Sequence, residues 1–220
     1  MSKPTLVIGN KCYSSWSLRP WLALRHWGVS FDEQQLWFAS GSFGAEVAEL
    51  SPTRRVPVLI DGTTTVWDSL AICEYANERW LDGQGWPAER AARAVARSVC
   101  AEMHSGFVGL RRALPMDCRA SGAPLAVDEA VRADVARMRA SIADCRARFG
   151  AGGPYLFGAF SLADCYLAPV VVRFKGYGVP VEGAVAAWMQ TMWALSALVG
   201  WVAAGRAEHE QYPPDVLGLP

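Results

Sequence analysis

The stretch Asn10-Lys-Cys-Tyr-Ser-Ser-Trp-Ser-Leu-Arg-Pro-Trp-Leu-Ala-Leu24 decides how the first part of this chain folds. The apolar run before it, Thr5-Leu-Val-Ile-Gly9, is typical of a short buried strand. After the serines, apolar side chains recur three or four residues apart and predict a helix. They are Leu18, Trp21, Leu22 and Leu24. Serine hydroxyls and free backbone N–H groups at the positive end of a helix favour an anion, so we expect one to bind there.

A second stretch, Arg54-Arg-Val-Pro-Val-Leu-Ile-Asp-Gly-Thr-Thr-Thr-Val-Trp-Asp-Ser-Leu-Ala-Ile72, predicts a hairpin followed by a helix. Residues 56–60 form one strand, Asp61-Gly62 forms the tight turn, and residues 63–67 form the return strand. Asp68 and Ser69 come just before a helix that we expect to run to about residue 80. Both are favoured helix caps, and both can also meet an ammonium or a carboxylate of a ligand.

The composition of the 220 residues predicts a folded chain with a large core and limits the kinds of partner. Hydrophobic residues make up 52% and charged residues 19%. The formal net charge is zero, which argues against nucleic acid or an anionic membrane as the main partner. No apolar run reaches the ~18 residues of a membrane span, and the first residues lack the apolar segment of a signal peptide. The six cysteines contain no C-x-x-C pair, so we expect reduced thiols in the cytoplasm, and no spacing indicates a metal site.

A change of composition near residue 82 predicts two parts. The first part is expected in the order strand–helix–strand–strand–strand–helix, which suits a thioredoxin-like fold. Asp82-Gly-Gln-Gly-Trp-Pro87 reads as a linker, and its proline suits a helix start. The rest is alanine-rich and helical, with a clear amphipathic helix after Asp128 that stops at Ala151-Gly-Gly-Pro154. Ser161-Leu-Ala-Asp164 is typical of a capping box.

Four of these motifs resemble the glutathione transferase superfamily, most closely its zeta and theta-like bacterial members. They are Ser14-Ser-Trp-Ser-Leu-Arg19, Val56-Pro57, Asp68-Ser69-Leu-Ala-Ile72 and Ser161-Leu-Ala-Asp164. Each motif is weak alone, but their order and spacing are those of the family, over nearly the whole chain. The resemblance implies an α/β thioredoxin-like domain over residues 1–81 and an all-α domain over residues 88–220. It also implies glutathione as co-substrate, a small electrophile as second substrate, and a homodimer.

The resemblance assigns the activation of glutathione to the serines of the first stretch. Zeta-class enzymes carry a Ser-Ser-Cys-Ser-x-Arg motif, which places the catalytic serine at Ser14 and a supporting donor at Ser15. These hydroxyls would hydrogen-bond the glutathione thiolate, the nucleophile of the reaction. Helix capping is the alternative role for both. Trp16 stands where the motif has cysteine, and this departure argues against zeta-type isomerase chemistry.

Cys12 is a second candidate for the nucleophile. Cys12-Tyr-Ser-Ser15 is similar to the monothiol motif of glutaredoxins and thiol-type transferases, and it lies close to a helix N-terminus. No proline follows it, however, and it lies too far upstream of Arg19 for the thiol-type pattern. We therefore favour a structural role for Cys12, as a small residue packed at the end of a strand, over a role as nucleophile.

The resemblance places the rest of glutathione along the second stretch. A cis proline at position 57 would turn the backbone of Val56 toward the cysteinyl backbone of glutathione. Asp68 and Ser69 would hold the γ-glutamyl ammonium and carboxylate while still capping their helix. Arg54 or Arg55 would reach the glycyl carboxylate, or both would be solvated loop charges.

The helix after Pro87 is expected to carry the acceptor site. Its packing stripe consists of Val95, Val99, Met103, Phe107, Leu110 and Leu114. His104 and Arg111 are seven residues apart, so on one helix they share a face beside that stripe. With Phe107 they would line the pocket for an acidic or carbonyl-bearing electrophile. The alternative is a partly buried histidine and a solvated arginine.

The sequence thus predicts a glutathione transferase. Two other functions stay open. One is a maleylacetoacetate-type cis–trans isomerase, in which glutathione adds and leaves without being consumed. The other is a non-catalytic protein of the same fold that uses its groove to bind a partner.

Overall fold

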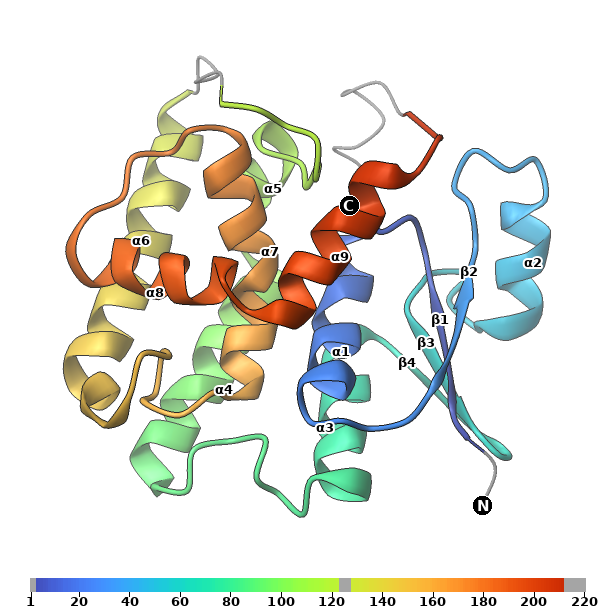
Figure 1. Ribbon diagram of the computed structural model, residues 1–220, viewed down its shortest axis with the longest axis horizontal. Helices are drawn as coiled ribbons and strands as arrows, with labels where there is room; N and C mark the ends of the chain where they lie inside the picture. The colour runs from blue at the N-terminus through green and yellow to red at the C-terminus, as the bar shows by residue number, and fades with distance from the viewer. Residues whose placement is uncertain (1–2, 123–127, 212–220) are drawn as a thin grey trace.

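The computed structural model describes residues 3–122 and 128–211. Of the two expected domain ranges, residues 1–2, 123–127 and 212–220 lie outside the described residues. The first part is a mixed sheet of four strands in the order β2-β1-β3-β4 (Figure 1). The strands are β1 (Thr5–Ile8), β2 (Asp32–Gln35), β3 (Val58–Asp61) and β4 (Thr64–Trp67). β1 is parallel to β2 and antiparallel to β3, and β3 pairs with β4 through the expected turn. This is the thioredoxin-like arrangement that the sequence predicted.

The two faces of this sheet bury different clusters, because successive side chains of a strand point to opposite faces. Leu6 and Ile8 of β1 face the large core shared with α1 (Ser15–His26) and α3 (Ser69–Trp80), whereas Val7 packs with Val47 of α2 (Phe43–Leu50). The sequence did not predict α2. This helix has eight residues and buries only one of them, so it carries little periodic signal.

The second part is all helical and is built around α7, which is buried along almost its whole length. Its helices are α4 (Arg90–Ser105), α5 (Val108–Ala113), α6 (Glu129–Phe149), α7 (Leu162–Gly176), α8 (Gly183–Trp193) and α9 (Ser196–Ala207), with a 3-10 turn η1 (Gly150–Gly152) after α6. The expected capping box begins α7: the backbone N–H of Ser161 donates to Asp164 at 2.9 Å. α7 packs against α1, and α9 crosses back to the first part (Figure 1).

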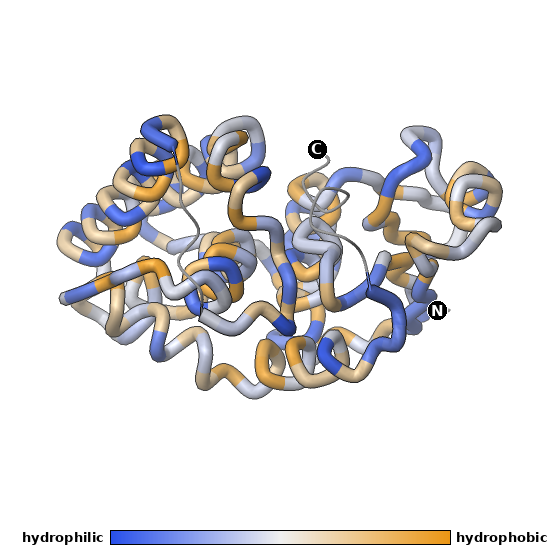
Figure 2. Tube along the Cα trace, turned by 90° about the horizontal axis from the view of Figure 1, so that it is seen from above, coloured by the Kyte–Doolittle hydropathy of each residue, from blue (hydrophilic) through white to orange (hydrophobic). Residues whose placement is uncertain are grey.

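Figure 2 shows hydrophilic residues along the outer rim of the helical part and hydrophobic residues along its inner turns. Such one-sided patterns are expected of helices that cover a shared core. No single helix in residues 3–122 and 128–211 is long and apolar enough to cross a membrane, although the bent pair α8 and α9 meets those criteria together.

The prediction that a single long helix carries both His104 and Arg111 is wrong. The helix ends at Ser105, and α5 begins at Val108. Phe107 between them has a left-handed backbone (φ 55°) and buries its ring in the core. Gly106 favours such a break, because glycine is a poor residue for a helix interior. His104 and Arg111 therefore belong to different helices.

Candidate active site

Ser14 lies at the N-terminus of α1, where the sequence placed it. Its backbone N–H donates to the carbonyl of Asn10 at 2.8 Å, and its side chain accepts from the N–H of Ser17 at 3.4 Å. The Ser14 hydroxyl donates to Oγ of Ser17 at 2.7 Å. Ser14 thus caps the helix. The cap does not exclude a ligand, because a hydroxyl hydrogen can rotate from one acceptor to another.

Ser15 accepts a hydrogen bond from a buried cation, Arg173, of the helical part. Nη2 of Arg173 on α7 donates to Oγ of Ser15 at 3.1 Å, and Nη1 donates to the carbonyl oxygens of Arg111 and Leu114. Burial, together with the nearby Arg19, lowers the pKa of Arg173 to about 9. In this bond Ser15 accepts, so its own hydrogen can be donated to a ligand.

Arg19 places a second cation beside the first. Its side chain is fully buried between two rings, 3.9 Å from the ring centre of Trp16 and 4.6 Å from that of Tyr166. Nε donates to the carbonyl of Tyr166 at 3.0 Å, while Nη1 and Nη2 have no hydrogen-bond partner among the described residues. Burial lowers the pKa of Arg19 to about 10. The start of α1 is therefore a region of positive potential.

Asp68 and Ser69 begin α3 and belong to a closed polar network. Oδ1 of Asp68 accepts from the N–H of Leu70 at 2.8 Å, and Oδ2 lies 3.3 Å from Nε2 of His104. The hydroxyl of Tyr166 lies 3.0 Å from Oγ of Ser69 and 2.6 Å from Nδ1 of His104. Asp68 is exposed and Ser69 is buried. Asp68 caps α3 as expected, whereas Ser69 is the first helical residue and its hydroxyl contacts Tyr166 instead of capping the helix.

The structure brings His104 and Arg111 together around Trp16, although they lie on separate helices. The His104 ring centre lies 5.2 Å from that of Trp16, and the Arg111 guanidinium lies 5.4 Å from the Trp16 ring centre. Burial lowers the pKa of Arg111. Phe107, which lies between these two residues in the sequence, is buried in the core with 7% of its surface exposed.

The remaining sequence candidates occupy separate places. The Val56–Pro57 peptide bond is cis, as the resemblance implied, and precedes β3. Arg54 and Arg55 are exposed. Cys12 is buried, and its thiol donates to Oδ1 of Asp117 at 3.2 Å. Across residues 3–122 and 128–211, no three or more His, Cys, Asp or Glu side chains form a group able to hold a metal ion.

Sequence reasoning missed Arg19, Tyr166 and Arg173 as members of this site. Tyr166 and Arg173 both lie on α7 and are seven residues apart, so they share one face of that helix. A signal was present: a hydroxyl and a guanidinium stand in the run Leu162-Ala-Asp-Cys-Tyr-Leu-Ala-Pro-Val-Val-Val-Arg-Phe174, which is otherwise mostly apolar. Polar residues in such a run need buried partners.

The fold is that of the glutathione transferases, and the chain belongs to the glutathione S-transferase superfamily. Residues 13–79 match the glutathione S-transferase N-terminal domain, and residues 128–204 match the glutathione S-transferase C-terminal domain. Together the two matches cover well over half of the chain.

Individual relatives differ in the functions that their names state. A stringent starvation protein A homolog of Haemophilus ducreyi is 23% identical over 163 residues, 74% of this chain and 72% of that protein. A probable maleylacetoacetate isomerase of Caenorhabditis elegans is 29% identical over 105 residues, 48% of each chain. A glutathione transferase homolog from Burkholderia GL BGR1, crystallised with bound glutathione, is 24% identical with a TM-score of 0.72, covering 94% of this chain and 100% of that one. The family is therefore established, and the reaction needs a separate argument.

Proposed function

We propose that the protein is a glutathione transferase that stabilises the glutathione thiolate at the start of α1. The observation that carries the proposal is the Arg173 guanidinium, 3.1 Å from Oγ of Ser15 at that helix N-terminus. A hydroxyl that accepts a hydrogen bond from a cation becomes a stronger donor to a second group. Ser14 is the first donor to the sulfur and Ser15 the second.

The required stabilisation is modest for such a site. A free thiol has a pKa of ~8.5, so at pH 7 only about 3% is thiolate. Lowering that pKa by ~2 units makes about three-quarters thiolate and needs ~2.7 kcal/mol. Donors at a helix N-terminus and two nearby guanidiniums supply interactions of this order.

The other end of glutathione would lie at the start of α3. The carboxylate of Asp68 takes the γ-glutamyl ammonium, and the hydroxyl of Ser69 with the first N–H groups of α3 takes the γ-glutamyl carboxylate. The cysteinyl backbone between these ends pairs with Val56, next to the cis proline at position 57. The polar network around Asp68 and Ser69 supports this placement, because it fixes both side chains.

The second substrate would be a small electrophile with a carboxylate or a polarised carbonyl. Arg111 would anchor the acidic group, His104 would steer or protonate the acceptor, and Phe107 would supply apolar surface. The shared contact of His104 and Arg111 with Trp16 supports a common pocket. A homodimer in the cytoplasm completes the proposal, on the strength of the family.

A cis–trans isomerase is the second candidate function, and the similarity to the probable maleylacetoacetate isomerase favours it. Both reactions need the thiolate, so they differ in whether glutathione is consumed. Trp16 at the place of the zeta-class cysteine weighs against the isomerase.

One experiment separates these functions and the binding-only alternative. The protein is first tested for retention on immobilised glutathione and then for turnover with a set of acidic, carbonyl and neutral electrophiles and a maleyl compound. We expect retention, and loss of free glutathione thiol as the conjugate forms. Turnover of the maleyl compound at constant glutathione would show the isomerase, whereas retention with no turnover would contradict the enzyme.

A further inference from the structure

Two cysteines from the two parts of the molecule meet next to the serine turn. Cys12 lies between β1 and α1, and Cys118 lies in the segment between α5 and α6. The backbone N–H of Cys118 donates to the carbonyl of Cys12 at 3.2 Å, and its thiol lies 3.6 Å from the carbonyl of Lys11. The neighbouring Cys12 thiol and burial raise the pKa of Cys118. Both side chains are buried.

This geometry fits a disulfide. A backbone hydrogen bond between two residues on adjacent segments brings their Cα atoms to about 5–6 Å, as in paired strands. Disulfides span Cα distances of about 4.4–6.8 Å. The Cys118 thiol already lies 3.6 Å from the carbonyl oxygen of the residue before Cys12, so we expect a change of side-chain torsion, rather than a movement of the chain, to join the two sulfurs.

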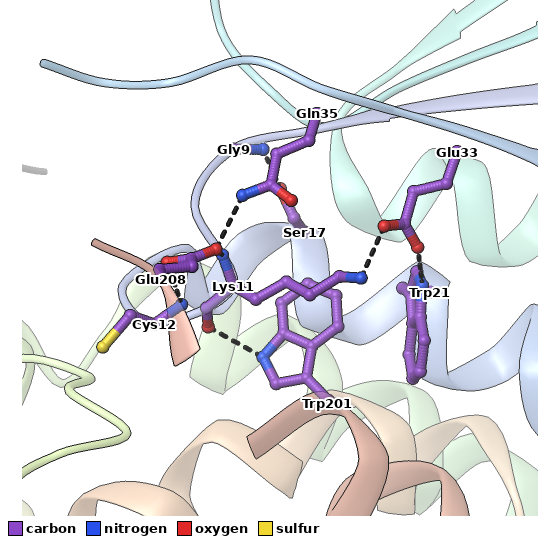
Figure 3. Close-up of polar contacts among 9 residues, drawn as sticks. All are labelled: Gly9, Lys11, Cys12, Ser17, Trp21, Glu33, Gln35, Trp201 and Glu208. Carbon is purple, nitrogen blue, oxygen red and sulfur yellow. Dashed lines mark hydrogen bonds and ion pairs between the residues drawn. The ribbon is translucent and has the colours of Figure 1, made fainter. Parts of the chain in front are cut away.

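The surrounding contacts hold this geometry in place. The carboxylate of Glu208 accepts from the N–H groups of Lys11 at 2.6 Å and Cys12 at 3.1 Å, and the indole of Trp201 donates to the Lys11 carbonyl (Figure 3). The guanidinium of Arg206 donates to the carbonyl of Cys118 at 2.7 Å. The end of α9 therefore fixes both cysteine backbones at once.

The two thiols have different neighbours, which assigns them different chemical roles. Nη1 of Arg119 lies 3.4 Å from Sγ of Cys12, and Oδ1 of Asp117 accepts the Cys12 thiol hydrogen at 3.2 Å. The Cys12 sulfur thus has a hydrogen-bond donor on one side and a carboxylate on the other, and the carboxylate can take the thiol proton when the sulfur attacks. Cys118 has a raised pKa and lies against Cys12, so it suits the second, resolving step.

We propose that Cys12 and Cys118 form a redox site that a hydroperoxide converts into a reversible disulfide linking the two domains. The Cys12 sulfur attacks one peroxide oxygen as its proton passes to the carboxylate of Asp117, so an S–O bond forms, the O–O bond breaks, and hydroxide leaves and takes up that proton as water. The Cys118 sulfur then attacks the Cys12 sulfenic acid, an S–S bond forms, the S–O bond breaks, and the second water leaves. Two thiols and one hydrogen peroxide give one disulfide and two waters.

The bond would tie the turn that carries Ser14 to the helical part. It would close a loop of about 100 residues, and such a cross-link restricts the unfolded chain strongly. The oxidised protein should therefore melt at a temperature about 5–10 °C above that of the reduced protein. A thiol reductant should break the disulfide and return the melting temperature to that of the reduced protein.

The test counts thiols in the full chain. Reduced protein is treated with hydrogen peroxide in modest excess, denatured and alkylated, then weighed by mass spectrometry and mapped by peptide digestion. From six cysteines, we expect two fewer alkylated thiols and a linked pair of peptides containing Cys12 and Cys118. The Cys145→Ala control, altered in α6, should behave in the same way, while Cys12→Ala and Cys118→Ala should form no disulfide.

Six alkylated thiols in the oxidised protein would overturn the proposal. So would a link mapped to Cys73, Cys100 or Cys165, or a two-thiol loss that persists in Cys118→Ala. The map of the unmodified sequence decides the matter even where a variant fails to fold. None of these readouts uses glutathione, so the result is independent of the proposed transferase function.

Discussion

The N-termini of α1 and α3 are similar helix starts, but the same helix, α7, contacts them with different side chains. α7 gives the cation of Arg173 to Ser15 at the first and the hydroxyl of Tyr166 to Ser69 at the second. The first start is surrounded by guanidiniums, whereas the second adds the carboxylate of Asp68. A site of the first kind suits a single anion, and a site of the second kind suits a group with both charges.

In the proposed function, the two ends have different kinetic roles. Interactions with the sulfur change as the reaction proceeds, so they affect turnover. Interactions with the remote γ-glutamyl group are equal in ground and transition states, so they affect the Michaelis constant for glutathione. Mutations at the two ends should therefore separate in kcat and KM.

The largest effect is expected for Ser14→Ala. The fold should remain, because other residues bury the core, but kcat should fall roughly ten- to a thousand-fold as for other charge-stabilising donors. Steady-state kinetics at saturating glutathione provides the measurement, with Ser15→Ala as the matched neighbour. Full activity in Ser14→Ala, together with loss in Ser15→Ala or Cys12→Ser, would transfer the catalytic role to another residue.

Arg111→Leu is expected to have the second largest effect and to change only the activity toward acidic acceptors. Loss of a charge-assisted hydrogen bond of ~1.5–3 kcal/mol should lower kcat/KM for acidic acceptors by about ten- to a hundred-fold. Activity toward a neutral aromatic acceptor should barely change, and Arg112→Leu, its exposed neighbour, should leave both unchanged. Equal losses on both acceptors would assign Arg111 a structural role.

Asp68→Ala and Ser69→Ala should each raise the Michaelis constant for glutathione by about ten-fold, with a smaller fall in kcat. Calorimetry of glutathione binding measures the same loss without turnover. If affinity stays unchanged in both variants, glutathione does not lie across α3. If kcat falls as much as in Ser14→Ala, the proposed separation between the two ends is wrong.

Tyr166→Phe should have the smallest effect. It removes one hydroxyl that contacts Ser69 and His104, a loss of about 0.5–1.5 kcal/mol and hence of about two- to ten-fold in glutathione affinity. The pKa of the bound glutathione thiol should not move, because Tyr166 serves the α3 end. A raised thiol pKa in this variant would mean that the two ends are coupled through α7.

Local signals in the sequence predicted much of the fold. The hairpin, the caps of α3 and α7, and the long helix α6 depend on residues a few positions apart, and all form as expected. The break at Phe107 was not predicted, because Gly106 alone is a weak local signal and the contacts that hold the break are tertiary. Phe107 is buried in the core, and the N–H of Leu110 donates to Asp134 of α6 at 3.0 Å.

The contacts around the candidate site were predicted only in part, for a similar reason. Motifs named Ser14, Ser15, Asp68 and Ser69, whose partners could not be read from spacing. Ser15 and its cation are 158 residues apart, and Ser69 and Tyr166 are 97 apart. Such pairs become visible only when α1 and α7 pack together.

The central claim is that the start of α1 stabilises the glutathione thiolate, and a titration of bound glutathione tests it most directly. The ultraviolet absorbance of the thiolate is followed against pH with saturating glutathione, and the free enzyme is subtracted. We predict a thiol pKa of about 6.5, ~2 units below the free value, and a shift back toward ~8.5 in Ser14→Ala. Bound glutathione that titrates near ~8.5 in the unmodified protein would contradict the account.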